Sequence, residues 1–333
     1  MTTRTSTYLA SALGVATLAV LAAFPQLLRG PVGSALAALA GAERFWLLGA
    51  AAGFVAAFAC TVGAWRAALA AAGGRIGSRQ AAARLGIGAM VNSFAPAKLG
   101  EAVKLALCAR AVESESRLRT LGGGYAALTA ARSLALVGLV VVASLAGALP
   151  IWPVFGLLGI VAALAALIRF SARARSNGRV AQLLQGLAEL GREPRRLAAV
   201  VGWTLAMACA QLAATVCVAA ALGLPHPVAA ALVILPALEL ASAFPVTPGS
   251  IGIGSGAVAV ALASRGIGMA DALGVGFAMQ GLQTLVSLTA GSLGALYLVR
   301  PGPVVRRWVV RAATAGASAA LAALVGMLVV NAV

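Results

Sequence analysis

Seven apolar runs, each long enough to cross a lipid bilayer as a helix, dominate this chain of 333 residues. A spanning helix needs about 20 predominantly apolar residues, because the hydrocarbon core of a bilayer is about 30 Å thick. Only 10% of the residues are charged and 62% are hydrophobic, which excludes a soluble domain of appreciable size. We therefore predict an all-α integral membrane protein with about seven spanning helices, at residues 8–28, 45–64, 122–149, 152–170, 197–222, 271–299 and 308–330.

Two further apolar stretches are interrupted by proline and glycine. Residues 85–108 contain Pro96 and Gly100, and residues 228–264 contain the segment FPVTPGSIGIGSG. Such residues end helices, so each stretch is predicted to form two half-helices that meet inside the membrane. The alternative is that the prolines merely kink two ordinary spanning helices, since membrane helices tolerate proline and glycine.

The arginines of the loops indicate which ends of these segments face the cytoplasm. Loops 65–84, 169–196 and 300–311 are rich in arginine, as is the loop after residue 108, and such loops stay cytoplasmic. The loops at Pro150 and at 225–227 contain no Arg or Lys and are predicted to face outward. We expect a multi-pass protein of the cell inner (plasma) membrane, with a cytoplasmic N-terminus and the C-terminus outside.

Both interrupted stretches then begin and end on one side of the membrane, which makes them re-entrant hairpins that point at each other. The order helix, hairpin, helix, helix occurs twice with opposite directions, as an inverted repeat within one transmembrane domain. Such repeats, with broken helices in matching positions, are typical of transporters whose binding site lies near the middle of the bilayer. The predicted parts are a first helix with an outer loop (1–44), repeat 1 (45–170, hairpin 85–108), a cytoplasmic loop (171–196) and repeat 2 (197–333, hairpin 228–264).

The first hairpin contains the segment NSFAPAKLGEAVK, which holds both lysines of the chain. Pro96 suits the first turn of a helix, and a helix N-terminus inside the membrane favours an anion such as a lipid phosphate. Lys98, Glu101 and Lys104 recur every three residues and share one face of the returning half-helix. We expect Lys98 to contact the phosphate. Lys104 is expected nearest the cytoplasmic surface, where it either extends to the interface or joins the site.

The second hairpin offers a similar helix start and unusually small side chains. Thr247 is a good N-cap for a helix that begins at Pro248. Gly249 and Gly252 have no side chain, so a head group or a partner helix can approach their backbone closely. We therefore expect these four residues to line the site from the second repeat.

Two charged residues inside apolar segments complete the predicted site. Arg132 lies about ten residues inside its helix, which is deep enough to require a partner, and Glu101 or Glu239 can supply one. Glu239 is the acidic residue of the second hairpin. It is either a proton-coupling carboxylate or one half of a buried salt bridge that fixes the hairpin.

This pair of signatures resembles the lysylphosphatidylglycerol synthase transmembrane region family, whose pattern is an Asn, then Pro-x-(Arg/Lys)-x-Gly-Glu-x-x-(Arg/Lys), and later a Pro- and Gly-rich signature. The resemblance covers nearly the whole chain and implies a flippase-like membrane domain without a soluble synthase domain. It assigns the site to Asn92, Pro96, Lys98, Gly100, Glu101, Lys104, Pro245, Pro248, Gly249, Ile251 and Gly252. The second signature departs from the pattern, because Ser250 replaces a glycine and GSG at 254–256 replaces an Arg-Glu pair.

The favoured function is a flippase-like or lipid-binding membrane protein that handles a lipid with an anionic (phosphate) head group, either a membrane phospholipid or a polyprenyl-phosphate-linked lipid. One alternative is a membrane-embedded lipid or sugar transferase with Glu101 or Glu239 as general base. The other is a non-transporting partner subunit of a separate lipid-modifying enzyme. We expect no cofactor or metal, because the four cysteines lack metal-ligand spacing, and no nucleic acid, because the loop arginines explain the formal charge of +17.

Cysteine labelling in intact cells tests the predicted orientation. In a background without the four native cysteines, single cysteines near Arg75, Arg117 and Gln185 should react only with a membrane-permeant reagent, because they face the cytoplasm. Cysteines near Pro150 and Pro225 should react with an impermeant reagent added outside. Labelling that put the two flanks of residues 85–108 on opposite faces would contradict the re-entrant hairpin.

Overall fold

The computed structural model of the chain describes residues 41–94, 99–112, 117–150, 155, 159, 194–242 and 253–298. Every regular element in these residues is an α-helix. Four of the helices are long and contain an apolar window long enough to cross a membrane: α4 (Arg44–Ala71), α7 (Arg117–Leu145), α10 (Pro194–Ala221) and α13 (Met269–Leu298). The prediction of an all-α membrane protein is confirmed, and four of the seven predicted spans are helices. The spans predicted at 8–28, 152–170 and 308–330 lie outside the described residues, apart from Phe155 and Gly159.

Both interrupted stretches consist of two shorter helices. The first forms α5 (Ser78–Phe94) and α6 (Leu99–Ala109), and the second forms α11 (Pro227–Ser242) and α12 (Ile253–Ala263). The helices therefore end where proline and glycine were predicted to end them. α5 begins seven residues before the predicted residue 85, because its first residues, SRQAAAR, combine polar residues with alanines and are mostly good helix formers.

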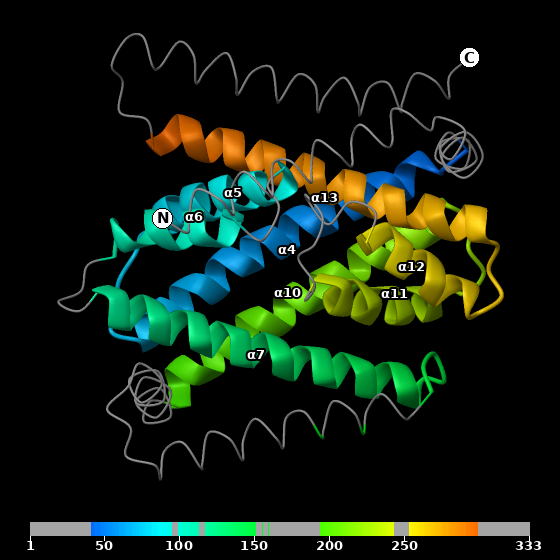
Figure 1. Cartoon of the computed structure of the whole chain (residues 1–333), viewed down its shortest axis with the longest axis horizontal. Coiled ribbons are helices and arrows are strands. Elements are labelled where there is room, and N and C mark those ends of the chain that lie inside the picture. Colours follow the sequence, from blue (N-terminus) through cyan, green and yellow to red (C-terminus); the bar gives the residue numbers. More distant parts are fainter. Residues whose placement is uncertain are drawn as a thin grey trace, which may run out of the picture.

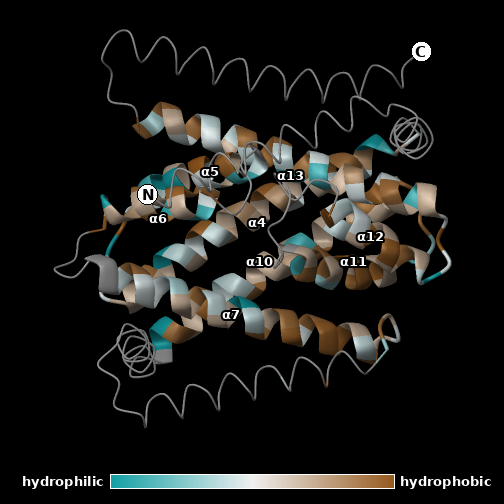
Figure 2. Ribbon diagram, in the orientation of Figure 1, coloured by the Kyte–Doolittle hydropathy of each residue, from teal (hydrophilic) through white to brown (hydrophobic). Residues whose placement is uncertain are grey.

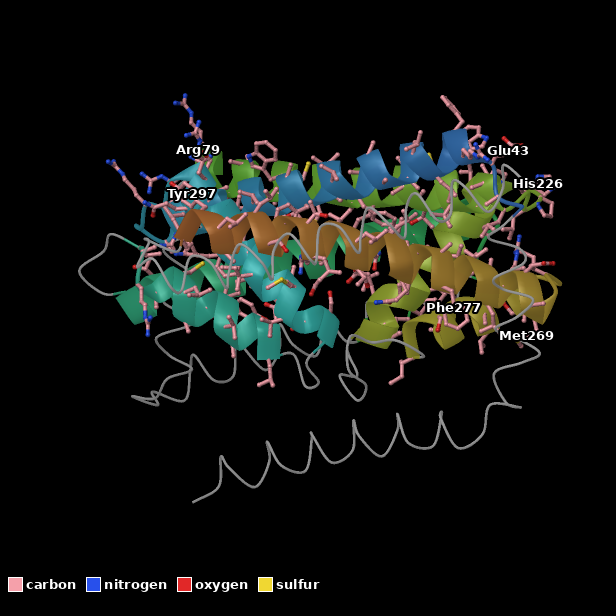
Figure 3. All side chains as sticks on the ribbon, turned by 90° about the horizontal axis from the view of Figure 1, so that it is seen from above. Glu43, Arg79, His226, Met269, Phe277 and Tyr297 are labelled. Atoms are coloured by element: carbon pink, nitrogen blue, oxygen red, sulfur yellow. The ribbon has the colours of Figure 1, made fainter. Side chains whose placement is uncertain are left out.

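The two pairs of short helices lie at opposite ends of the molecule. Figure 1 shows the four long helices crossing its whole length, with α5 and α6 at one end and α11 and α12 at the other, and Figure 3 shows the same arrangement from above. α5 and α6 are antiparallel, since the Nε atom of Arg84 donates a hydrogen bond to the Leu107 carbonyl at 3.1 Å while Gly88 faces Lys104. The broken ends of both pairs thus point toward the middle of the molecule.

An antiparallel contact between α4 and α10 runs through the centre. A Cβ atom at Gly53 would lie 2.8 Å from the Cβ of Ala214, and one at Gly63 would lie 2.5 Å from the ring of Trp203. The two ends are joined by backbone carbonyls: the amide of Glu43 donates to the Ala221 carbonyl at 2.9 Å, and Arg196 donates to the Ala70 carbonyl at 3.0 Å. Small residues allow this close approach, as is usual for membrane helices.

A second close contact joins α5 to α13. A Cβ atom at Gly291 would lie 2.9 Å from the Gly86 carbonyl oxygen, and one at Gly294 would lie 2.8 Å from the Cα of Ala83. The two helices therefore touch backbone to backbone. This contact connects the first hairpin directly to the long helix that follows the second hairpin.

The packing partners of the two halves correspond to each other. If α4, α5, α6 and α7 are exchanged with α10, α11, α12 and α13, every helix pair that packs closely maps onto another such pair. One buried apolar cluster joins the α4–α10 pair to α11, α12 and α13, and a second joins it to α5, α6 and α7. α4 and α10 also end alike, with Gly73 at φ 82° and Gly223 at φ 67°, in the left-handed conformation that glycine adopts readily at helix ends.

Charge differs between the two ends of the molecule. Hydrophobic residues cover much of the long helices, whereas hydrophilic residues gather at the helix ends (Figure 2). The end that holds α5 and α6 has Arg66, Arg75, Arg79, Arg84, Arg110, Arg195 and Arg196. The opposite end has Glu43, Arg44, Arg265 and Asp271. Among the described residues, the arginines of the predicted cytoplasmic loop 65–84 thus lie at one end, together with Arg195 and Arg196, whereas Pro150 and Pro225 lie at the other.

Substitution at Gly53 tests the central contact. Gly53→Ala should destabilise the protein by about 1–3 kcal/mol, because the new methyl group overlaps Ala214 and forces α4 and α10 apart. Gly138→Ala in α7 is the matched control, since no atom beyond the neighbouring backbone of its own helix lies within 4 Å of the added Cβ. Thermal unfolding in detergent should show a lower midpoint for Gly53→Ala alone. Equal midpoints for the two variants would contradict the described packing.

Candidate functional site

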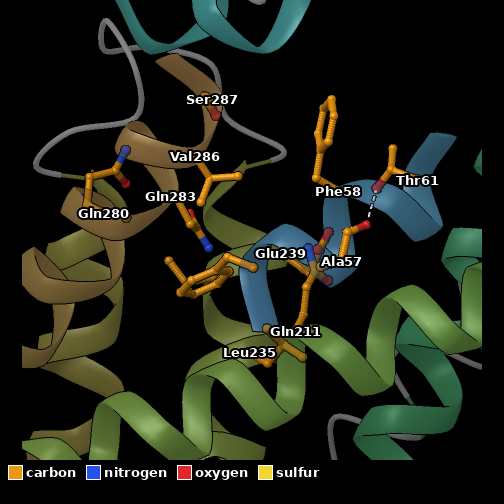
Figure 4. Close-up of a pocket in the computed structure, with 13 residues that line it drawn as sticks. Ala57, Phe58, Thr61, Gln211, Leu235, Glu239, Gln280, Gln283, Val286 and Ser287 are labelled. Carbon is orange, nitrogen blue, oxygen red and sulfur yellow. Dashed lines mark hydrogen bonds between the residues drawn. The ribbon is translucent and has the colours of Figure 1, made fainter. Parts of the chain in front are cut away.

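A polar cavity of about 320 Å³ lies at mid-length, among α4, α10, α11, α12 and α13. Its apolar lining includes Phe54, Phe58 and Leu235, and its polar lining consists of Thr61, Gln211, Glu239, Gln280, Gln283 and Ser287. Figure 4 shows side chains from separate helices turned toward this common space. Polar groups are costly inside a bilayer and usually line a cavity or a substrate path there, so this cluster is the candidate functional site.

The cavity residues come from positions that helix geometry brings together. Gln280, Gln283 and Ser287 are spaced by three and four residues and therefore share one face of α13. Gln211 comes from the facing α10, and Glu239 comes from the last turn of α11. Primary amides can both donate and accept hydrogen bonds, whereas an ionised carboxylate only accepts them. The cavity can therefore bind hydroxyl, amide or ammonium groups.

Lys104 is buried, with 8% of its surface exposed. Its ammonium forms an ion pair with Glu101, one turn earlier on α6, and lies 5.1 Å from the ring centroid of Trp65 on α4. Of the two alternatives for Lys104, extension to the interface is wrong, because Trp65 and Glu101 hold the side chain inside the helix assembly. The expected pairing along the Lys-Glu-Lys face is present between these two residues.

Asn92 and Gly100 face each other across the first hairpin. A Cβ atom at Gly100 would overlap both the Gly88 carbonyl and the Asn92 amide group, so only glycine fits there. The Asn92 Oδ1 atom is buried and accepts no hydrogen bond among the described residues. The two signature residues therefore set how closely α5 and α6 approach each other.

Arg132 does not have the expected carboxylate partner. Within the described ranges the chain has one ion pair, between Glu101 and Lys104, and the Nη2 atom of Arg132 donates instead to the Met207 sulfur at 3.5 Å. Glu101 is occupied by Lys104, and Glu239 lines the polar cavity. Arg132 is an exposed residue of α7.

Two cations, Lys104 of the first hairpin and Arg132 of α7, lie close to the polar cavity along the central helices. The Trp65 ring contacts the Lys104 ammonium, and Trp65 follows Thr61 of the cavity wall by four residues in α4. Met207, the partner of Arg132, is four residues from Gln211. Residues four apart share one face of a helix about one turn apart. One face of α4 and one face of α10 therefore connect the two groups.

Some predicted site residues lie outside the described part of the chain, namely Pro96, Lys98, Thr247, Pro248, Gly249 and Gly252. The sequence interpretation also omitted residues that the structure places at the site: Thr61, Trp65, Gln211, Gln280, Gln283 and Ser287. The polar side chains three and four residues apart in MQGLQTLVS were a readable signal for the α13 face. Trp65 had no such signal, because its role depends on contact with α6.

The buried ion pair can be tested by a double-mutant cycle. Lys104→Met should lower the free energy of unfolding by about 2–4 kcal/mol, because it leaves the Glu101 carboxylate without its partner. Combining Lys104→Met with Glu101→Gln should recover part of that loss, since no charge then stays unpaired. Thermal unfolding of the four proteins in detergent measures the coupling. Additive effects of the two substitutions would contradict the pair.

Comparison with known proteins agrees with an all-α membrane protein. No curated protein and no solved structure matches the chain. Residues 9–291 match the family described as the lysylphosphatidylglycerol synthase TM region. This range includes both predicted signatures and every described helix except the end of α13. The chain therefore belongs to the lysylphosphatidylglycerol synthase TM region family, whose members are membrane proteins tied to lipid metabolism.

Proposed function

We propose that this protein binds a lipid with an anionic head group and moves that head group across the membrane, as a flippase does. The observation that carries the proposal is the polar cavity at mid-length of an otherwise apolar helix assembly. A lipid head group cannot cross the hydrocarbon core without replacing its hydration, and amide and carboxylate side chains can replace it. The family membership, which ties the chain to lipid metabolism, supports this choice.

The head group is proposed to lie with its phosphate toward the cations and its remaining groups toward the cavity. Lys104 is already neutralised by Glu101, whereas Arg132 makes no ion pair among the residues that the structure describes. Arg132 therefore has guanidinium donors available for a phosphate, which it can bind through two parallel hydrogen bonds. Glu239 and the glutamines would then accept and donate hydrogen bonds to hydroxyl or ammonium groups of the same lipid. Lys98 is proposed as a second phosphate contact.

The movement is proposed to use two re-entrant hairpins within an inverted repeat. The corresponding packing partners of the two halves and the opposite placement of α5–α6 and α11–α12 support this scheme. Transporters with such repeats expose a central site alternately to the two sides. The arginine-rich end would face the cytoplasm, in accordance with the positive-inside rule.

Charge removal at the site tests the function in vesicles. Purified protein is reconstituted with a fluorescent phosphatidylglycerol, and a reductant added outside reports inner-leaflet lipid that becomes accessible. Arg132→Gln and Glu239→Gln should each slow the movement by about tenfold or more, because each removes a charge-assisted hydrogen bond. Arg44→Gln and Glu43→Gln are the matched controls, since they remove the same charges at the exposed start of α4.

The same assay tests the role of Lys98. Lys98→Ala should behave like Arg132→Gln, whereas Lys98→Arg should retain most of the activity because the positive charge stays. Variants are compared only where their unfolding midpoints equal that of the wild type. Lipid movement that is equally fast with and without the protein, or unaffected by all three charge removals, would refute the proposed function.

A further inference from the structure

An apolar groove lies beside the polar cavity, between α4, α5 and α13. It encloses about 510 Å³ and is lined mainly by small and aliphatic side chains, among them Val55, Ala82, Leu285 and Leu293. Two lining residues break this pattern: Arg79, in the first turn of α5, and Tyr297, near the end of α13. Figure 3 shows both of them at the arginine-rich end of the molecule.

The groove and the polar cavity share part of their walls. Phe58 of α4 and Val286 of α13 line both spaces. The groove therefore extends from a cationic and phenolic group at one end of the molecule to the apolar wall of the polar cavity. From Tyr297 to Leu282, α13 rises about 22 Å, which exceeds the roughly 15 Å depth of one leaflet's hydrocarbon.

We propose that this groove is a binding site for one phospholipid of the arginine-rich side, with its phosphate at Arg79 and Tyr297 and an acyl chain along α13 toward Phe58. Phe58 and Val286 then separate the bound lipid from the polar cavity. The site would load the lipid before its head group passes this wall, and that role rests on the proposed function. Binding in the groove does not depend on it.

Charge and shape favour this occupant. Arg79 makes no ion pair among the described residues, and Tyr297 adds a hydroxyl group that can bind a phosphate oxygen. Arg79 also lies in the first turn of α5, where free backbone N–H groups favour an anion. Below this end the groove is apolar, as an acyl chain requires. An anionic head group with an extended chain matches both parts.

Photo-crosslinking tests the site in the intact chain. The protein is reconstituted into phosphatidylcholine vesicles that contain phosphatidylglycerol with a diazirine at the end of one acyl chain. Crosslinks should concentrate on α13 around Leu285 and on α4 around Phe58. Thr289→Trp should reduce this labelling by at least about fivefold, because the indole fills the groove.

Thr129→Trp in α7 is the matched control. Thr129 and Thr289 are both exposed, and each donates its hydroxyl to the carbonyl four residues earlier at 2.8 Å. The control should leave the groove labelling unchanged. A second variant, Arg79→Gln, should lower labelling by the phosphatidylglycerol probe about fivefold and by a phosphatidylcholine probe less, because one surface cation attracts the net anionic lipid more strongly.

The outcomes separate this proposal from the flippase proposal. Labelling that persists in Thr289→Trp, or that falls equally on the exposed face of α7, shows annular lipid only and overturns the groove site. Labelling mainly on residues 300–333 shows that a segment of the chain itself occupies the groove and also overturns it. Groove labelling that responds as expected, together with absent lipid movement, supports the groove site and refutes the flippase function alone.

Discussion

The close contact between α4 and α10 is the interaction on which the rest of the structure depends. Lipid tails are as apolar as leucine, so helices in a membrane gain little from burying aliphatic surface against each other. Glycines at 53 and 63 instead allow the two helices to approach until backbone and side-chain atoms meet. Both buried clusters and the polar cavity are built on this pair, because each contains residues from α4 and α10. The position of the cavity therefore follows from where two long helices can touch.

The two halves of the described site differ in the charged groups that they contain and in how these groups are paired. The first half pairs its buried cation with an acid and an aromatic ring, at Lys104, Glu101 and Trp65. The second half contains uncharged amides around one carboxylate, Glu239. An ion pair inside a protein repays its desolvation only when the geometry is good and the partners stay together, which suits a structural role for Lys104. The hydrogen-bonding capacity of the site thus comes mainly from the half whose sequence signature departs from the family pattern.

The helices could be predicted from local features, whereas the site depended on contacts between helices. Apolar runs predicted α4, α7, α10 and α13, and prolines and glycines predicted that each interrupted stretch would form two helices, because both signals act within a few residues. The Glu101–Lys104 pair was also readable from its spacing, and Glu239 from being the acidic residue within an apolar stretch. The burial of Lys104 was not, because it requires Trp65, which lies 39 positions earlier in the chain. The same holds for Gln211, a single polar residue that becomes informative only once α10 faces α11 and α13.

The glycine contact between α5 and α13 affects how the molecule can deform. The predicted repeats divide the chain at residues 171–196, but backbone contacts at Gly86, Gly291 and Gly294 join a helix before this division to a helix after it. Surfaces that fit this closely resist shear, because any sliding drives the backbones into each other. The mechanical units therefore differ from the predicted repeats: α5 belongs with α13, and a rigid-body boundary must lie elsewhere, along interfaces filled by flexible side chains.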